Sequence, residues 1–243
     1  AQATYSHRSQ FLTISFLAGL AHVCHICPAF ALFKLFHKMR VINTRSVIRR
    51  AYEQATRRFT SQRGEGSTPK VHVDQERRLI TISPEDPARH SASCIFMHGL
   101  GDTAHGWSDL CTAIAAENPH LRFVCPTAPT RRVTMNGGMP MPSWFDIHGL
   151  DRLQEPSVGL DHSAAYIRKL LADEEKAVGS QRCVLAGFSQ GGALALWVGI
   201  QLPRQLAGIL ALSAFLPNAT AVVPSLQALD TPILQCHGED DAM

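Results

Sequence analysis

The chain has 243 residues, 45% of them hydrophobic and 18% charged, as expected for one soluble domain with a sizeable core and an appended segment. Its seven irregularly spaced cysteines argue against a disulfide framework and favour a reducing compartment. The net charge of +3 is unevenly spread: residues 1–70 hold eleven Lys or Arg against two acids, and residues 71–243 hold twelve against eighteen. We therefore expect a basic N-terminal segment ahead of a mildly acidic globular domain.

Residues 1–38 form an apolar segment. Between Phe11 and Phe33 there is no Asp, Glu, Lys or Arg, and this stretch is long enough to span a bilayer, although it contains two histidines and a proline. A membrane anchor or signal-like segment is one interpretation, and translated sequence upstream of a start at Met39 is another. The first residue is alanine, so we expect either a processed chain or an N-terminus that is not the true start.

Residues 39–70 form an Arg-rich segment and a linker. Seven arginines stand against Glu53 alone between Met39 and Arg63, and apolar residues recur at roughly helical spacing. This pattern resembles a mitochondrial presequence, while a basic helix lying on a membrane surface or in solvent stays open. No nucleic-acid-reading module accompanies it, so we expect no nucleic-acid partner. Residues 61–70 have the composition of a linker.

The globular domain is expected over residues 71–243. Helical patterns separate its short apolar runs: Leu160, Ala164, Ile167 and Leu171 share one helix face, and residues 193–202 are apolar nearly all round. This alternation predicts an α/β fold whose mostly parallel sheet carries helices on both faces. Two of the expected strands lie within residues 71–83, on either side of a polar turn. The other expected strands lie at 91–99, 121–126, 182–187, 208–214 and 232–238.

The strongest local signal is Gly187-Phe188-Ser189-Gln190-Gly191, a GxSxG sequence between an apolar strand and an apolar helix. This setting predicts a nucleophile elbow, in which flanking glycines permit a tight turn and the serine stands at the N-terminus of a helix. A serine nucleophile needs a base, usually a histidine oriented by a carboxylate. In this fold the chain order is serine, acid, histidine, and Glu239, Asp240 and Asp241 follow a predicted strand. One of these acids is therefore the expected triad carboxylate.

Four ordered motifs are similar to the acyl-protein thioesterases, the cytosolic carboxylesterase and lysophospholipase branch of the α/β-hydrolases. The resemblance covers residues 91–243 and does not extend to residues 1–70. The motifs are "FMHGLGDTAHGW" (96–107), "PTAPTRRVTMNGGMPMPSWFDI" (126–147), "GFSQGGALAL" (187–196) and "ILQCHGEDD" (233–241).

The resemblance implies a role for six positions. Ser189 matches the nucleophile, Asp241 matches the triad acid, and the backbone N–H groups of Leu100 and Gln190 match the oxyanion donors. Trp144 and Phe145 would line the site near the acyl chain, or would be two core aromatics beneath a loop. The implied activity is hydrolysis of fatty-acyl thioesters such as S-palmitoyl groups on protein cysteines, with carboxylesterase or lysophospholipase activity on oxygen esters as the alternative.

The resemblance also implies that no metal or organic cofactor is required. Cys24 and Cys27 form a lone CxxC, which without a second pair does not predict a zinc site. The expected partners are acylated proteins or lysolipids at a membrane surface. The expected location is cytoplasmic, with mitochondrial or membrane-anchored placement through the N-terminal segment as alternatives.

The triad histidine is missing from the expected position. All twelve histidines precede Asp241, and His98, His105 and His237 match structural positions of the family rather than its base. We expect a chain that is truncated after the catalytic acid and is weakly active as it stands. The alternative is an impaired scaffold that has lost its base.

Overall fold

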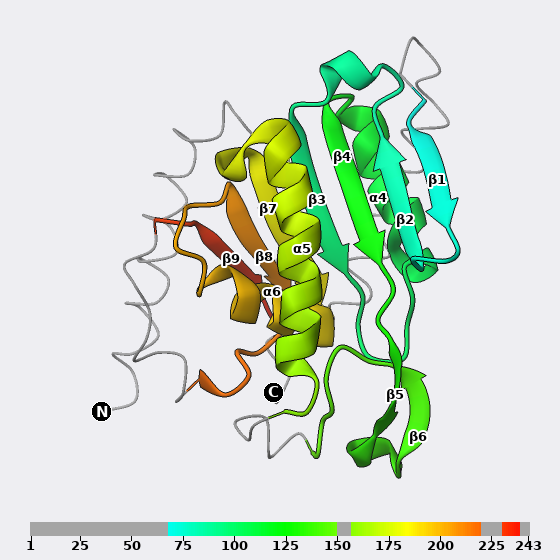
Figure 1. Cartoon of the computed structure of the whole chain (residues 1–243), viewed down its shortest axis with the longest axis vertical. Helices are drawn as coiled ribbons and strands as arrows, with labels where there is room; N and C mark the ends of the chain where they lie inside the picture. Colours follow the sequence, from blue (N-terminus) through cyan, green and yellow to red (C-terminus); the bar gives the residue numbers. More distant parts are fainter. Residues whose placement is uncertain (1–67, 150–156, 220–229, 239–243) are drawn as a thin grey trace. The chain divides into compact units, whose positions relative to one another are not determined.

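The fold is described by a computed structural model that covers residues 68–149, 157–219 and 230–238 (Figure 1). One mixed sheet runs in the order β1-β2-β4-β3-β7-β8-β9. The first two strands pair antiparallel with each other, β2 pairs antiparallel with β4, and all further pairs are parallel. The strands are β1 (Lys70–Asp74), β2 (Leu79–Ser83), β3 (Ala92–Met97), β4 (Leu121–Pro126), β7 (Cys183–Phe188), β8 (Gly208–Leu212) and β9 (Ile233–Cys236).

Three α-helices of the described chain cover the sheet. The helix α4 (His105–Glu117) packs on one face in a cluster with the side chains of β2 and β4. The helices α5 (Leu160–Val178) and α6 (Gln190–Gly199) share the other face, where α5 crosses in front of the sheet in Figure 1. Short 3-10 turns are η1 (Pro87–Arg89), η2 (Thr134–Asn136) and η4 (Ser180–Arg182). The prediction of an α/β fold with helices on both faces is confirmed.

Both helices that the hydrophobic pattern predicted are present, and both bury the predicted residues. All four predicted positions of α5 face the core, and every residue of α6 is buried. Glycines with positive φ end α5 on both sides, at Gly159 and Gly179. Each adopts a backbone conformation that a residue with a Cβ rarely takes. The pattern therefore gave both the position of these helices and the faces that pack.

A hairpin outside the main sheet was not predicted. Strands β5 (Thr130–Val133) and β6 (Met139–Pro142) pair antiparallel beyond the carboxyl ends of β3 and β4 (Figure 1). Its turn includes Gly137 and Gly138, both with positive φ. The prolines at 140 and 142 conceal this strand in the sequence, because proline within a run argues against a central strand. The hairpin places the segment after it, residues 143–147, beneath the carboxyl edge of the sheet.

The predictions for the N-terminal segments, residues 1–38 and 39–67, lie outside the described residues. Within the described part of the chain, the helices are too short or too polar to cross a membrane. The proposed domain boundaries therefore stay predictions, except that the strands of the globular part begin at Lys70.

Candidate active site

Ser189 occupies the turn between β7 and α6 with φ of 52° and ψ of −118°. A non-glycine residue with positive φ is uncommon, and such strain concentrates at functional sites. The Ser189 amide donates to the Leu212 carbonyl at 2.8 Å, and its carbonyl accepts from the Ala193 amide at 2.9 Å. The neighbouring strand and the helix therefore hold the residue on both sides. Its half-buried side chain stands at the N-terminus of α6.

The glycines around Ser189 are required by close backbone contacts. A Cβ on Gly191 would lie 2.2 Å from the carbonyl oxygen of Met97, and one on Gly187 would lie 2.3 Å from the carbonyl carbon of Gly191. Both distances are far below van der Waals contact. The turn thus folds tightly on itself and presses against the end of β3. This is the steric reason for the two glycines of the GxSxG sequence.

The two predicted oxyanion donors come from neighbouring loops. Leu100 lies in the turn after β3, and Gln190 follows Ser189; the strands β3 and β7 pair in register up to Met97 and Gly187. In the described part of the chain, neither the Leu100 amide nor the Gln190 amide donates to a backbone carbonyl. The Gln190 amide is one of those left over at the start of α6, and such amides suit a developing negative charge. Their role as oxyanion donors stays a prediction.

The strand that precedes the predicted acid ends at the same edge. Phe188, Leu212 and Cys236 are paired across β7, β8 and β9, and the Ser213 amide donates to the Cys236 carbonyl at 2.7 Å. The chain therefore leaves β9 level with the nucleophile turn, two strands away. Asp241 itself lies outside the described residues, so its triad role stays a prediction.

His98 is engaged through both ring nitrogens. Its Nδ1 lies 2.7 Å from the Gly99 carbonyl, and its Nε2 accepts from the Ala128 amide at 3.0 Å, which assigns the proton to Nδ1. Burial lowers the pKa of His98, and this outweighs the Gly99 carbonyl and Asp102, which act to raise it. A neutral, fully bonded and buried imidazole has no free nitrogen with which to take the serine proton.

The comparisons with known proteins give the family. Residues 78–243 match the phospholipase/carboxylesterase family. The chain belongs to this family. It is 40% identical over 181 residues to acyl-protein thioesterase 1 of Mycosarcoma maydis, covering 68% of this chain and 75% of that protein. It is 41% identical over 157 residues to acyl-protein thioesterase 1 homolog 1 of Dictyostelium discoideum, covering 63% and 70%.

Solved structures agree with this assignment. Zea mays acyl-protein thioesterase 2 is 30% identical with a TM-score of 0.55, over 65% of this chain and 74% of that one. Arabidopsis thaliana SOBER1 is 27% identical with a TM-score of 0.56, over 62% and 75%. The resemblance to the acyl-protein thioesterases is confirmed, and the protein is an α/β-hydrolase.

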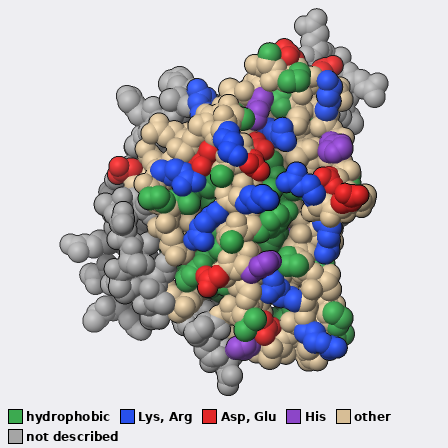
Figure 2. All heavy atoms as spheres, viewed as in Figure 1, with side chains coloured by type: hydrophobic (Ala, Val, Ile, Leu, Met, Phe, Trp, Pro, Cys, Tyr) green, Lys and Arg blue, Asp and Glu red, His purple; other side chains and the backbone are tan. Residues whose placement is uncertain are grey.

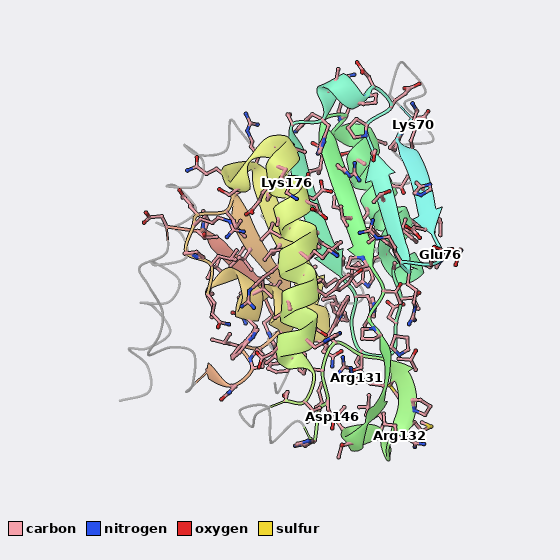
Figure 3. All side chains as sticks on the ribbon, in the orientation of Figure 1. Lys70, Glu76, Arg131, Arg132, Asp146 and Lys176 are labelled. Carbon is pink, nitrogen blue, oxygen red and sulfur yellow. The ribbon has the colours of Figure 1, made fainter. Side chains whose placement is uncertain are left out.

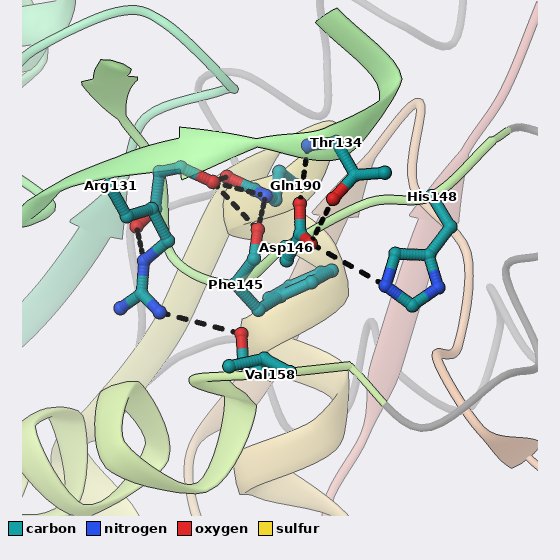
Figure 4. Close-up of polar contacts among 8 residues, drawn as sticks. Arg131, Thr134, Phe145, Asp146, His148, Val158 and Gln190 are labelled. Carbon is teal, nitrogen blue, oxygen red and sulfur yellow. Dashed lines mark hydrogen bonds and ion pairs between the residues drawn. The ribbon is translucent and has the colours of Figure 1, made fainter. Parts of the chain in front are cut away.

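In this hydrolase the side chain of Gln190 has a role that the sequence did not reveal. It is 1% exposed and points into the core, where its amide bonds the segment after the hairpin (Figure 4). Its Nε2 donates to the Phe145 carbonyl at 2.7 Å and to Ser143 Oγ at 3.0 Å, and its Oε1 accepts from the Trp144 amide at 2.9 Å. Gln190 was predicted only for its backbone N–H, because a motif gives no information about where a side chain ends.

Trp144 and Phe145 have no exposed surface in the structure. The Trp144 indole donates to the His98 carbonyl at 2.8 Å, and the Phe145 ring packs edge-on against Phe215 at 6.4 Å. Both belong to the core cluster beneath α5 and α6. The structure thus shows these aromatics as buried packing residues, and contact with an acyl chain stays a prediction.

A second polar group ties the hairpin to the same segment. Asp146 accepts from the Thr134 amide at 2.8 Å and from its hydroxyl at 2.6 Å, and lies 3.4 Å from His148 Nε2 (Figure 4). Burial acts to raise the pKa of Asp146, but the Thr134 donors and His148 lower it by more. Arg131 of β5 donates to the Ser143 carbonyl at 2.8 Å and lies close to Asp146 (Figure 3). An ionised Asp146 therefore holds the turn between β5 and β6 against this segment.

Four of the five described cysteines are buried. Burial, together with the carboxylates of Glu175 and Glu174, raises the pKa of Cys183 to about 12, so this thiol is not a competing nucleophile. Within the described ranges, no group of three or more His, Cys, Asp or Glu side chains is placed to hold a metal ion.

Proposed function

We propose that this hydrolase cleaves fatty-acyl thioesters on proteins through an acyl-enzyme on Ser189. The observation that carries the proposal is the strained Ser189 turn, with two amides beside it that bond no backbone carbonyl of the described chain. The relatives that are named acyl-protein thioesterase supply the substrate class.

The reaction proceeds in two steps. Ser189 Oγ attacks the thioester carbonyl while a base takes its proton, and the amides of Leu100 and Gln190 stabilise the oxyanion. The carbon–sulfur bond then breaks, the cysteine thiol leaves with the proton, and water hydrolyses the ester on Ser189. We expect the base to be a histidine that is oriented by the carboxylate of Asp241.

The test uses the full-length protein and a fluorophosphonate probe, which reacts with activated serines. We expect labelling of the unsubstituted protein and no labelling of Ser189→Ala. Thioester turnover in that variant should be reduced by a factor of about 10⁴ or more. A chain that is not labelled, or a variant that retains turnover, would contradict the proposal. The thermal unfolding midpoint of Ser189→Ala, compared with that of the unsubstituted protein, shows whether the variant is folded.

The locus beyond codon 243 tests the source of the base. An in-frame histidine downstream of the Asp241 codon supports the enzyme. A stop codon directly after codon 243 supports the alternative, a catalytically impaired scaffold.

A second candidate activity is hydrolysis of oxygen esters, as in carboxylesterases and lysophospholipases. It is favoured by the description of the family, phospholipase/carboxylesterase. Serine attack proceeds in the same way on both ester types, so the same residues serve either substrate. Turnover on a thioester and an oxygen ester with the same acyl chain separates the two, and a higher kcat/KM on the oxygen ester would replace the first proposal.

We also propose that the protein is cytoplasmic and works at a membrane surface, where acylated proteins and lysolipids are found. The support is the net charge of +9 over residues 1–70. A fluorescent fusion that starts at Met39 tests this location. Mitochondrial fluorescence would instead support the interpretation of residues 39–63 as a presequence.

A further inference from the structure

Two separate loops carry the predicted oxyanion donors, and the sheet fixes only the strand ends beneath them. Leu100 is three residues beyond the end of β3, and Gln190 is two residues beyond the end of β7. A donor must lie about 2.7–3.1 Å from the developing oxyanion, so both amides need a defined position. Some contact beyond the strand pairing must therefore set their separation.

Residues 143–145, which we call the brace, contact both loops. On one side, the Gln190 side chain accepts from the Trp144 amide and donates to the Phe145 carbonyl and to the Ser143 hydroxyl. Figure 4 shows the bond to Phe145. On the other side, the Trp144 indole donates to the carbonyl of His98, which begins the turn that holds Leu100. The His98 and Trp144 rings also pack at 5.1 Å between centroids.

The brace is itself held in place. The Ser143 hydroxyl donates to the Phe145 carbonyl at 2.7 Å, and Ser163 on α5 donates to the Trp144 carbonyl. Gln190, Ser143, Trp144 and Ser163 are all at most 1% exposed. A buried polar group that loses its hydrogen-bond partner raises the free energy of the folded state. A network in which every group is bonded therefore favours a single arrangement of the brace and its neighbours.

We propose that the side chains of Gln190 and Trp144 are positioning residues that set the separation of the two oxyanion amides through the brace. The inference rests on the proposed function. Gln190 then has two roles: its backbone N–H donates to the oxyanion, and its side chain fixes the position of that N–H group. The inference gives Trp144 a hydrogen-bonding task in place of contact with the acyl chain.

The test compares Gln190→Met, which keeps the shape but removes the amide, with Trp144→Phe, which keeps the ring but removes the indole donor. The matched control is Trp197→Phe on α6. Trp197 is 8% exposed, and its indole nitrogen has no hydrogen-bond partner among the described residues. The control thus loses a similar buried ring without losing a hydrogen bond. All variants are made in the full-length protein.

We expect kcat and the rate of fluorophosphonate labelling of Ser189 to fall about 10-fold to 100-fold in both variants. We expect KM to stay within about 3-fold of the value for the unsubstituted protein, because the acyl site is unchanged. For the same reason, the relative activities on substrates of different acyl-chain length should be the same in the variants and the unsubstituted protein. The control should stay within about 3-fold of the unsubstituted protein in every measurement.

Equal losses in Trp144→Phe and Trp197→Phe would overturn the inference, and so would a changed chain-length profile in Trp144→Phe, which would place the ring at the acyl chain. If Gln190→Met does not fold, as judged by its thermal midpoint, the Trp144→Phe comparison decides. Failure of the unsubstituted protein to react with the probe would instead overturn the proposed function, and the inference with it.

Discussion

The backbone of Ser189 illustrates how strain is held at one residue. A non-glycine residue in this region of φ costs about 1–3 kcal/mol, which the surrounding structure must offset. Here the offset comes from hydrogen bonds to Leu212 and Ala193 and from the tight packing of Gly191 against Met97. The position of the Ser189 hydroxyl therefore depends on the glycine contacts that support its turn.

Gly191→Ala should disrupt the nucleophile turn. The new Cβ would lie 2.2 Å from the Met97 carbonyl oxygen, which is backbone and has little room to move. We expect a loss of about 3 kcal/mol or more in the free energy of unfolding, measured by urea denaturation. Gly208→Ala is the control, because its Cβ would meet the Pro232 carbonyl at an ordinary 3.5 Å. Similar stability losses in the two variants would contradict the steric explanation.

His98 should make folding stability dependent on pH. Its pKa is lowered in the folded state by burial, so the unfolded state binds a proton more readily. The free energy of unfolding should therefore fall as pH decreases from about 6.5 towards the folded pKa. Burial lowers the pKa of His90 and of His120 too, so they add slopes of the same sign.

The check is urea denaturation between about pH 7.5 and 5. His98→Asn should reduce the slope of stability against pH, and the part that remains should come from the other histidines. An unchanged slope in this variant would show that the fold does not disfavour protonation of His98.

Among the elements, α5 is attached to the sheet at the end opposite the candidate active site. Its residue Glu174 is 8% exposed and accepts from the Ser93 hydroxyl of β3 at 2.6 Å. Arg122 of β4 lies 3.4 Å from the same carboxylate, and His90 Nε2 lies 2.9 Å from Ser93 Oγ. A buried carboxylate with these partners ties the helix to two parallel strands.

Ser93→Ala should weaken this attachment. It removes one donor from a buried carboxylate, and a loss of this kind costs about 1–3 kcal/mol. Thermal or urea unfolding measures the loss, with Ser108→Ala as the control, because the Ser108 hydroxyl bonds a carbonyl at the exposed start of α4. We expect the control to stay within about 0.5 kcal/mol. A neutral result for Ser93→Ala would mean that water replaces the hydroxyl.

At the scale of the whole molecule, charge is divided between the two parts of the sequence. Residues 71–243 carry a net −6, and Lys and Arg side chains on the face of α5 are interspersed with acids (Figure 2). The excess positive charge is concentrated in residues 1–70. An anionic surface would therefore attract the N-terminal segment more strongly than the globular domain.

Replacing Arg49, Arg50, Arg57 and Arg58 by Gln should weaken binding to anionic vesicles. Each basic residue near such a surface contributes about 1 kcal/mol, so the four together correspond to a loss of up to about 1,000-fold in vesicle affinity, measured by co-sedimentation. Lys176→Gln is the control, since Lys176 is exposed on α5. Equal binding of the four-fold variant and the control would contradict a membrane role for these arginines.

Local patterns along the chain predict much of the fold and the position of the candidate site. Hydrophobic runs located the strands of the main sheet and the helices α5 and α6, GxSxG between a strand and a helix located Ser189, and the motif order identified the family. Such signals are readable because strand and helix periodicity and tight turns depend on neighbouring residues.

The contacts between side chains that are distant in the sequence become known from the folded structure alone. Gln190 bonds Trp144 across 46 positions of the chain, and the Trp144 indole bonds His98 across another 46. The folded structure also showed that both nitrogens of His98 are occupied. No local pattern predicts these pairs, because strand order and the path of the β5–β6 hairpin bring them together, and burial then makes each hydrogen bond obligatory.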